Sequence, residues 1–389
     1  MKLTTHLQMI FAALVGLVLL SLGWLDPATA SLMVIGATLS QSGKVNLHDI
    51  AKSLDPSGKT ATVVELLNQS NEIITDMVWM EGNLPTGHET TVRTGLPTAI
   101  WRQLYQGVPA SKSQRAKVTD AIGMLETRSE VDVEAVNLNA QNENFRLSEA
   151  KAFLEGLNQQ FAQTLFYGNT AINPERFMGL APRYSAISGA TNGVNVISAG
   201  GAGADNTSIW LIVWSPETIC GIYPKGSVAG IQHKDLGEYD AFDSNSQRFR
   251  ALGDLWKWKC GLTVSDWRYA VRICNVDISD LVAQTGTQAS TAATAIIKLM
   301  IRAMARIPSM GAGVPVFYAN RTVKEMLAIA AMDKSQNAIS VEPAINQFGQ
   351  VAPGSVAGQG TGIRGGTVRF LGVPVRTCDQ LLTNEAAVS

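Results

Sequence analysis

The sequence predicts an α+β protein with one long helix, a one-sided antiparallel sheet and an α/β layer near the C-terminus. Three observations predict this class. Apolar residues recur at three- and four-residue steps over 147–167, the period changes to two between 207 and 275, and helix and strand patterns alternate over 292–377. With 389 residues, 46% of them hydrophobic, the chain can bury a large core in one big or two ordinary domains.

Composition excludes two classes of protein. The 31 Lys and Arg against 32 Asp and Glu leave a net charge of −1, which argues against a nucleic-acid binder that works through a general basic field. The high apolar content argues against disorder. Charged residues make up 16% of the chain, against roughly 25% in average soluble proteins. This composition is typical of a chain that covers much of its surface with copies of itself.

The first 31 residues have the layout of a secretory signal peptide. Lys2 precedes an apolar run over 9–24, and Ala28-Thr29-Ala30 offers a small-residue cleavage site. The run is shorter than the ~20 residues that a membrane span needs. Two interpretations follow: export with a mature chain that starts near Ser31, or an upstream extension before a start at Met33.

The next segments predict a helix and then an extended arm. Apolar spacing over 60–80 predicts an amphipathic helix that ends at Gly82. From 82 to 128 the chain has no helical period, and alternation at 90–93 and 99–102 predicts a two-stranded β excursion. Because this segment is too long for an ordinary loop, we expect a functional arm. It carries six basic and three acidic residues, a net charge of +3.

An acidic segment and the clearest helix follow. Residues 130–155 hold six acidic and two basic residues, a net charge of −4. The helix over 147–167 has Ser148 as a candidate N-cap and Gly168 at its exit. Its apolar stripe consists of Leu147, Ala150, Leu154, Leu157, Phe161 and Leu165. Such a long helix with one apolar stripe is expected to pack along a sheet as a spine.

Strand patterns fill the middle of the chain. Residues 209–214 predict a buried strand with Trp210 and Trp214 on one face. Residues 255–263 place Trp256, Trp258 and Cys260 on one face, and 266–275 continue the pattern. Together they predict an antiparallel sheet with one apolar face.

The C-terminal third predicts helices over 292–306 and 321–332, the second with Asn320 as its N-cap, and strands over 314–318 and 367–377. Helix and strand alternating over about 100 residues indicate a self-contained α/β layer.

The sequence contains no motif that indicates a catalytic, cofactor or metal site. The glycines at 360–365 match G-x-G-x-x-G, but a polar loop precedes them and a strand follows, which is the wrong context for phosphate binding. Asp132 and Glu134 lack the further ligands that Ca²⁺ requires. The four cysteines have no zinc spacing, and no histidine stands beside a nucleophile in sequence. We therefore expect no enzyme activity, no cofactor and no metal.

Several short segments resemble the major capsid proteins of tailed bacteriophages, in particular those of short-tailed phages and related prophages, which have the Hong Kong 97-type fold. The segments are EGNLPTGH at 81–88, VRTGLP at 92–97, FRLSEA at 145–150, FAQTLFYGN at 161–169, NTSIW at 206–210, GIYPKG at 221–226 and DWRY at 266–269. The resemblance covers about Met33 to the C-terminus, and it is the combination that is specific.

The resemblance implies a division of the chain. Residues 33–83 would form the N-terminal arm and helix, 84–128 the extended β loop, 129–276 the peripheral domain with the spine helix and sheet, and 277–389 the axial domain. Only 12 residues follow Thr377, too few for the peripheral strands that close the archetypal fold. We therefore expect a permuted connectivity, in which the strands at 207–275 supply the peripheral sheet before the axial domain begins.

The resemblance also implies a function and partners. The chain would be a major head protein that assembles in the bacterial cytoplasm into hexamers and pentamers of an icosahedral shell enclosing double-stranded DNA, without sequence-specific DNA binding and without a membrane. A scaffolding protein and a portal are expected partners, and a cement protein is a further one. Residues 1–32 would then be an extension outside the fold. The alternative is an exported β-rich surface or binding protein with a cleaved signal peptide.

The opposite charges of the arm and the spine region predict a contact between neighbouring subunits, because complementary surfaces favour the correct pairing. The predicted contact residues are Arg93, Arg102, Lys112, Arg115, Lys117, Glu130, Asp132, Glu134 and Glu149.

Overall fold

The computed structural model describes residues 71–134, 142–188, 191–243, 246–282, 287–332, 339–343 and 366–389. The predictions for 1–32, for the helix at 60–70 and for the glycines at 360–365 lie outside these residues. The chain forms two compact units. The described part of the first contains 128–153 and 234–255, and the second contains 71–127, 154–233 and 256–389. One long helix and three strands run through both units.

The described strands belong to one thirteen-stranded sheet, and seven of them form the centre of the second unit. These seven follow the order β4-β9-β5-β10-β13-β12-β11, and β5 is antiparallel to both β9 and β10. The bounds are β4 Val196–Ser198, β5 Asn206–Trp214, β9 Ala270–Asp277, β10 Val314–Ala319, β11 Ile339–Pro343, β12 Gly366–Phe370 and β13 Val373–Thr377.

The central strand β5 is buried on both faces. Its residues IWLIVW alternate between two cores: Ile209, Leu211 and Val213 face one, whereas Trp210 and Trp214 face the other. This alternation confirms the predicted common face of the two tryptophans. Because helices or other chain segments cover both faces, the strand is apolar throughout.

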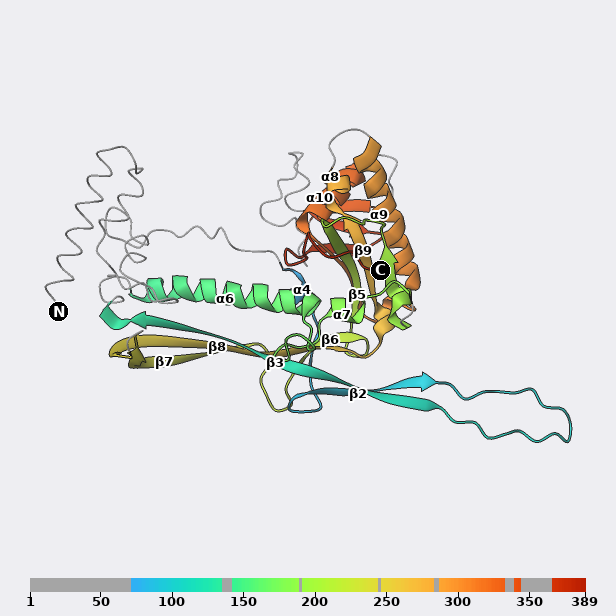
Figure 1. Cartoon of the computed structure of the whole chain (residues 1–389), viewed down its shortest axis with the longest axis horizontal. Coiled ribbons are helices and arrows are strands. Elements are labelled where there is room, and N and C mark those ends of the chain that lie inside the picture. Colours follow the sequence, from blue (N-terminus) through green and yellow to red (C-terminus); the bar gives the residue numbers. More distant parts are fainter. Residues whose placement is uncertain are drawn as a thin grey trace. The chain divides into compact units, whose positions relative to one another are not determined.

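Three helices, α8 (Ile278–Val282), α9 (Thr287–Arg306) and α10 (Arg321–Met332), cover the first face (Figure 1). The predicted helices over 292–306 and 321–332 are confirmed. The side-chain oxygen of Asn320 accepts a hydrogen bond from the backbone N–H of Thr322 at 3.1 Å, as expected of an N-cap.

The long helix α6 (Asn142–Tyr167) contributes to the core on the other face. Leu157, Phe161 and Leu165 of the predicted stripe are buried, whereas Leu154 is 38% exposed. The Phe161 ring lies 4.3 Å, centroid to centroid, from the ring of Trp258, which belongs to the alternating pattern predicted at 255–263. The prediction of a helix packed along the tryptophan-bearing strand is confirmed.

Smaller elements complete this side of the unit. They are α4 (Ile73–Asp76), α7 (Leu180–Arg183), β1 (Trp79–Glu81) and β6 (Ile219–Tyr223), with 3-10 turns at Thr191–Asn195, Trp267–Tyr269 and Met310–Ala312. β1 pairs in parallel with β6. A Cβ added to Gly221 would lie 2.8 Å from the Trp79 ring, so only glycine lets these strands approach.

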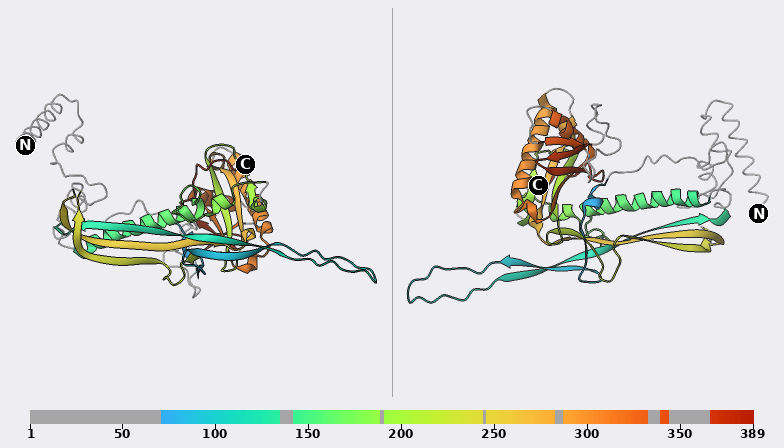
Figure 2. Two further views of the ribbon diagram at one scale, coloured as in Figure 1. Left: turned by 60° about the horizontal axis from the view of Figure 1, so that its bottom comes forward. Right: turned by 180° about the vertical axis from the view of Figure 1, so that it is seen from behind.

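An antiparallel hairpin made by β2 (Gly87–Gly95) and β3 (Gln114–Asp132) extends from the second unit and continues into the loop 96–113 (Figure 2). The strands β7 (Ile231–Phe242) and β8 (Arg248–Val264) pair with each other, and β8 also pairs with β3 and β6. The predicted two-stranded excursion is therefore present, although the alternating stretch 99–102 lies in the loop and not in a strand.

Three predicted elements differ in the structure. In the described part of the helix predicted at 60–80, only Ile73–Asp76 is helical, because the chain then extends to pair with β6. The segment 266–275 begins with a 3-10 turn before β9. The strand predicted at 367–377 is a hairpin, since Leu371 and Gly372, at φ 48° and 85°, turn the chain between β12 and β13.

The segment 207–275 divides between two places: β8 packs beside α6 as expected of the peripheral sheet, whereas β5 and β9 join the C-terminal layer. β5 and β9 lie within the segment 207–275 that was assigned to a separate peripheral sheet, yet β5 pairs directly with β10 of the C-terminal α/β layer. A domain boundary at 276 would therefore cut a continuous sheet. The reason is that both faces of β5 are apolar, so the strand requires cover on two sides and takes a central position.

Candidate subunit-contact surfaces

The tip of the arm is an exposed apolar surface. The side chains of Trp101 and Tyr105 are fully exposed, and the other large apolar residues of the loop are 43–85% exposed. We call these residues the arm tip: Leu96, Ile100, Trp101, Leu104, Tyr105 and Val108. Soluble monomers rarely expose so many neighbouring large apolar side chains, and such patches mark interaction surfaces. The sequence prediction missed them, although large apolar residues in a segment without periodicity are the signal that could have found them.

The predicted basic contact residues lie along this arm. Arg93 and Arg115 occupy directly opposite positions of β2 and β3, and Arg102 and Lys112 lie in the loop. All four are exposed, and none forms an ion pair with another described residue. Lys117 differs, since its ammonium lies 2.7 Å from the carboxylate of Glu89 on the facing strand.

Two of the predicted acidic residues already interact within their own chain, so they are less available for a contact with another subunit. The carboxylate of Glu130 lies 3.2 Å from the guanidinium of Arg128, and both belong to the first unit. The carboxylate of Asp132 accepts a hydrogen bond from the backbone N–H of Glu134 at 2.9 Å. Glu149 lies in α6, and its side chain is outside the described residues.

A buried carboxylate fixes β3 where the arm leaves the body of the second unit. Asp120 is 5% exposed and accepts hydrogen bonds from the Arg183 guanidinium at 2.7 Å, the Thr263 hydroxyl at 2.8 Å and the Val264 N–H at 3.1 Å. These donors come from α7 and β8. Because both oxygens of the carboxylate accept hydrogen bonds from other elements, the base of the arm is held in one position.

A second buried network secures the C-terminal segment. The Arg272 guanidinium on β9 donates to Glu385 at 2.8 Å and to the Ser208 hydroxyl on β5 at 3.0 Å. The Tyr167 hydroxyl at the end of α6 also donates to Glu385, and burial raises the pKa of Tyr167 far above its usual value. The network joins the helix, two strands and the C-terminal segment.

A third network attaches the chain at 71–77 to the same sheet. Arg376 on β13 donates to Glu72 at 2.9 Å and lies 3.4 Å from Asp76. The Tyr318 hydroxyl donates to Asp76 at 3.1 Å. Burial raises the pKa of Asp76, although the charge of Arg376 opposes the shift.

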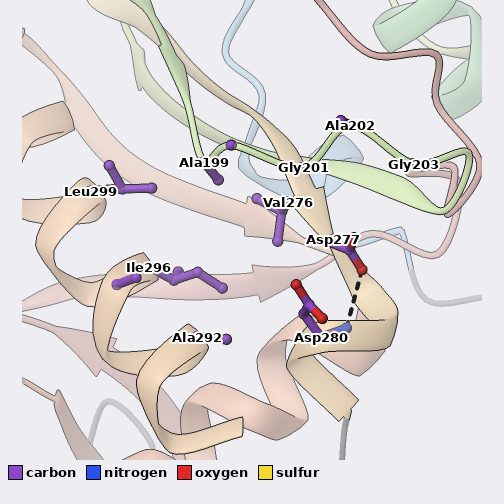
Figure 3. Close-up of a pocket in the computed structure, with 12 residues that line it drawn as sticks. Ala199, Gly201, Ala202, Gly203, Val276, Asp277, Asp280, Ala292, Ile296 and Leu299 are labelled. Carbon is purple, nitrogen blue, oxygen red and sulfur yellow. Dashed lines mark hydrogen bonds between the residues drawn. The ribbon is translucent and has the colours of Figure 1, made fainter. Parts of the chain in front are cut away.

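A pocket of about 820 Å³ lies between the glycine-rich turn 199–203, the end of β9 and α9 (Figure 3). Val276, Ile296 and Leu299 form apolar walls, and Asp277 accepts a hydrogen bond from the backbone N–H of Asp280 at 3.1 Å. The pocket brings together no nucleophile, base and orienting group of the kind that catalysis requires.

The cysteines and the remaining polar groups give no chemical site in the described part of the chain. Cys220, Cys260, Cys274 and Cys378 are all buried and unpaired, as small core residues. No three potential metal ligands among the described residues come together.

None of the described helices combines the length and apolarity needed to cross a membrane.

Comparison with known proteins identifies the family of this chain. The model of the family described as major capsid protein GP7 matches residues 55–389. A chain from the structure of bacteriophage Epsilon15 is 33% identical, with a TM-score of 0.64, over 91% of this chain and 98% of that one. The chain belongs to the GP7 major capsid protein family.

Two further solved structures are more distant. A capsid chain of the empty GTA particle is 10% identical with a TM-score of 0.38, over 59% of this chain and 98% of that one. The SrpI encapsulin of Synechococcus elongatus is 10% identical with a TM-score of 0.40, over 62% and 99%. A search of curated protein sequences found no match.

The family membership confirms the predicted α+β fold of the Hong Kong 97 type and the predicted function. The capsid protein is a structural subunit of an icosahedral virion shell and associates with copies of itself into capsomers. The arm tip is thus an exposed surface of a protein whose function is self-association.

Proposed function

We propose that the capsid protein builds its shell from hexamers and pentamers in which the arm of each subunit lies across a neighbour. The observation that carries this proposal is the arm tip, whose large apolar side chains have no cover in the single chain. Burying an apolar side chain of this size in a contact stabilises it by about 1.5–3 kcal/mol. A shell supplies a neighbour at every arm, so the exposed apolar area is covered on assembly.

The division of the chain follows from this proposal. Residues 84–128 are the extended loop, and 147–167 form the spine helix of the peripheral domain. The axial domain is the α/β layer around β10 and β13, enlarged by β5 and β9, which pair with it. The shell encloses double-stranded DNA without sequence-specific contacts, since the net charge of the chain is −1.

Other aspects follow from the family. We expect assembly in the bacterial cytoplasm with a scaffolding protein and a portal, and a cement protein as a further partner. We propose that shell formation requires no catalytic step and no cofactor.

The charges of the arm refine the contact. Four basic residues are exposed and without an ion-pair partner among the described residues: Arg93, Arg102, Lys112 and Arg115. Lys117 contributes less, because Glu89 of its own chain already neutralises it. We propose that the four basic residues meet the acidic segment 130–155 of a neighbour. Single exposed pairs contribute about 0–1 kcal/mol each, so correct placement comes from their repetition around the shell.

The first experiment expresses the chain from Met33 in bacterial cytoplasm, with the full chain in parallel, and examines both by sedimentation and negative-stain microscopy. Closed shells or capsomer-sized rings support the proposal. A chain that remains monomeric with its scaffolding protein present contradicts it.

A charge-reversed variant tests the arm contact. Arg93→Glu combined with Arg102→Glu and Lys112→Glu is expected to abolish shells while circular dichroism of the chain stays unchanged. Lys117→Glu is the matched control for local damage, because it disturbs a contact within the hairpin. Normal shells from the triple variant would refute the electrostatic part of the proposal.

A further inference from the structure

The outer face of α9 carries an isolated patch of charge around an apolar residue. Lys298, Ile301 and Arg302 are exposed and share one face, since they are three and four residues apart. Ile301 is 45% exposed. Neither cation forms an ion pair with another described residue. The helix contains no acidic residue at any position, so nothing on α9 itself neutralises this face.

The outer face of α10 has the opposite character. Glu325 and Ile329 are exposed one turn apart, and Ile329 is 50% exposed. The nearby cations are already engaged: Arg321 pairs with Asp379 at 2.5 Å, and Lys324 lies 3.6 Å from Glu72. Glu325 has no ion-pair partner among the described residues. The face therefore combines one unneutralised carboxylate with one uncovered apolar side chain.

The two faces belong to different edges of the α/β layer. α9 packs over β9, whereas α10 packs over β13 and β11, at the other end of the strand order. Both helices lie on the same face of the sheet and contact each other, and their exposed surfaces differ in charge. A closed ring of identical subunits requires such an arrangement, because each subunit must offer two different surfaces to its two neighbours.

We infer that α9 of one subunit packs against α10 of the next subunit around a capsomer, with Ile301 against Ile329 and with Lys298 and Arg302 beside Glu325. The spacing fits, because 298 to 301 and 325 to 329 are each about one helical turn, ~5 Å along the axis. The inference rests on the proposed hexamers and pentamers and specifies which surfaces join the α/β layers within them.

Disulfide trapping tests the contact directly. The full chain carrying Ile301→Cys and Ile329→Cys is assembled and oxidised, and non-reducing gel electrophoresis reads the products. We expect a ladder that extends beyond dimers to pentamers and hexamers, because a head-to-tail contact links every subunit to two others. The native cysteines are buried, so the wild-type chain and each single variant are controls.

The outcomes separate the contact from the proposed function. Intact shells that give no crosslink, or dimers alone, overturn the α9–α10 contact while the capsomer proposal stands. A wild-type chain that forms neither rings nor shells overturns both.

Charge exchange gives an independent test if the cysteine variant fails to assemble. Lys298→Glu with Arg302→Glu, and Glu325→Lys alone, are each expected to lower the yield of shells several-fold while leaving thermal unfolding of the chain unchanged. All three changes together are expected to restore the yield, because the attraction returns with its sign exchanged. Shells at wild-type yield from the separate variants, or no recovery in the combined one, would overturn the inference.

Discussion

Arg272 and Glu385 form a buried ion pair, with the guanidinium 2.8 Å from the carboxylate and side-chain exposures of 6% and 5%. The two residues are 113 positions apart in sequence. Their contact holds the C-terminal segment against β5 and β9, and the Tyr167 hydroxyl extends it to the end of α6. One residue pair thus joins three parts of the second unit.

Removing one partner of this pair is expected to destabilise the chain strongly. Glu385→Ala leaves the Arg272 charge buried without compensation, which costs about 3–5 kcal/mol. Denaturant unfolding of the unassembled chain measures the loss. Glu238→Ala is the matched control, since its partner Arg250 is 57% exposed and a solvent-exposed ion pair contributes little to stability. Equal losses in the two variants would contradict the assigned role.

Asp120→Asn is expected to loosen the base of the arm. The amide keeps the size of the side chain but removes the charge that faces Arg183, and a hydrogen bond between charged groups contributes about 1.5–3 kcal/mol. Limited proteolysis should show faster cleavage near the ends of β2 and β3, together with a lower unfolding free energy. Glu89→Gln, which affects the exposed pair with Lys117, should change neither measurement appreciably.

Replacing the aromatic residues of the arm tip is expected to separate assembly from folding. Trp101→Ser with Tyr105→Ser removes side chains that touch little in the single chain, because both are fully exposed. The melting temperature of the unassembled chain should stay within about 1–2 °C of wild type, since surface changes contribute within ~0.5 kcal/mol. Shell yield should fall at least several-fold in sedimentation. Val228→Ser, an exposed apolar change outside the arm, serves as the comparison.

The buried thiols predict a loss of stability at alkaline pH. Burial raises the pKa of both Cys220 and Cys378 from 9.0 to about 12, and the Asp120 charge adds to the shift at Cys220. The folded chain therefore keeps neutral thiols at a pH where the unfolded chain ionises them. The two thiols therefore contribute fully to the free energy of unfolding below pH 9, and this contribution is lost between pH 9 and about 12.

Unfolding free energies measured from pH 8 to 11 check this dependence. Each thiol should contribute a fall of about 1.4 kcal/mol per pH unit within the window. Cys220→Ala and Cys378→Ala should each flatten the curve. An identical slope in wild type and the double variant would show that other groups cause the loss.

Local patterns predicted the elements that depend on local physics. The C-terminal half of the stripe on α6, the alternation in β5 and β8 and the cap at Asn320 appear where the sequence placed them. The start of α6 differs, because the helix begins at Asn142 and Ser148 therefore lies inside it and is not its N-cap. These features follow from side-chain period and from hydrogen bonds within a few residues, so a single sequence contains enough information.

Elements that depend on distant partners were predicted poorly. Residues after Asp76 extend because β6 offers them an edge to pair with, and nothing within the segment itself indicates that partner. The turn at Leu371-Gly372 was hidden because leucine rarely adopts a positive φ, here 48°. The basic residues of the arm stay predicted contact residues. The exposure of the apolar arm tip and the ion pair between Lys117 and Glu89 could be recognised only in the structure.

By itself the sequence determined the fold class, the long helix, the buried strands and the resemblance to capsid proteins, because hydrophobic periodicity and short motifs can be recognised in the sequence alone. Only the tertiary structure decided that β5 and β9 join the C-terminal layer, that Asp120 holds the arm, and which charges are already paired. Those facts depend on contacts between residues far apart in sequence, and burial on two faces, not local pattern, selected among the possible pairings.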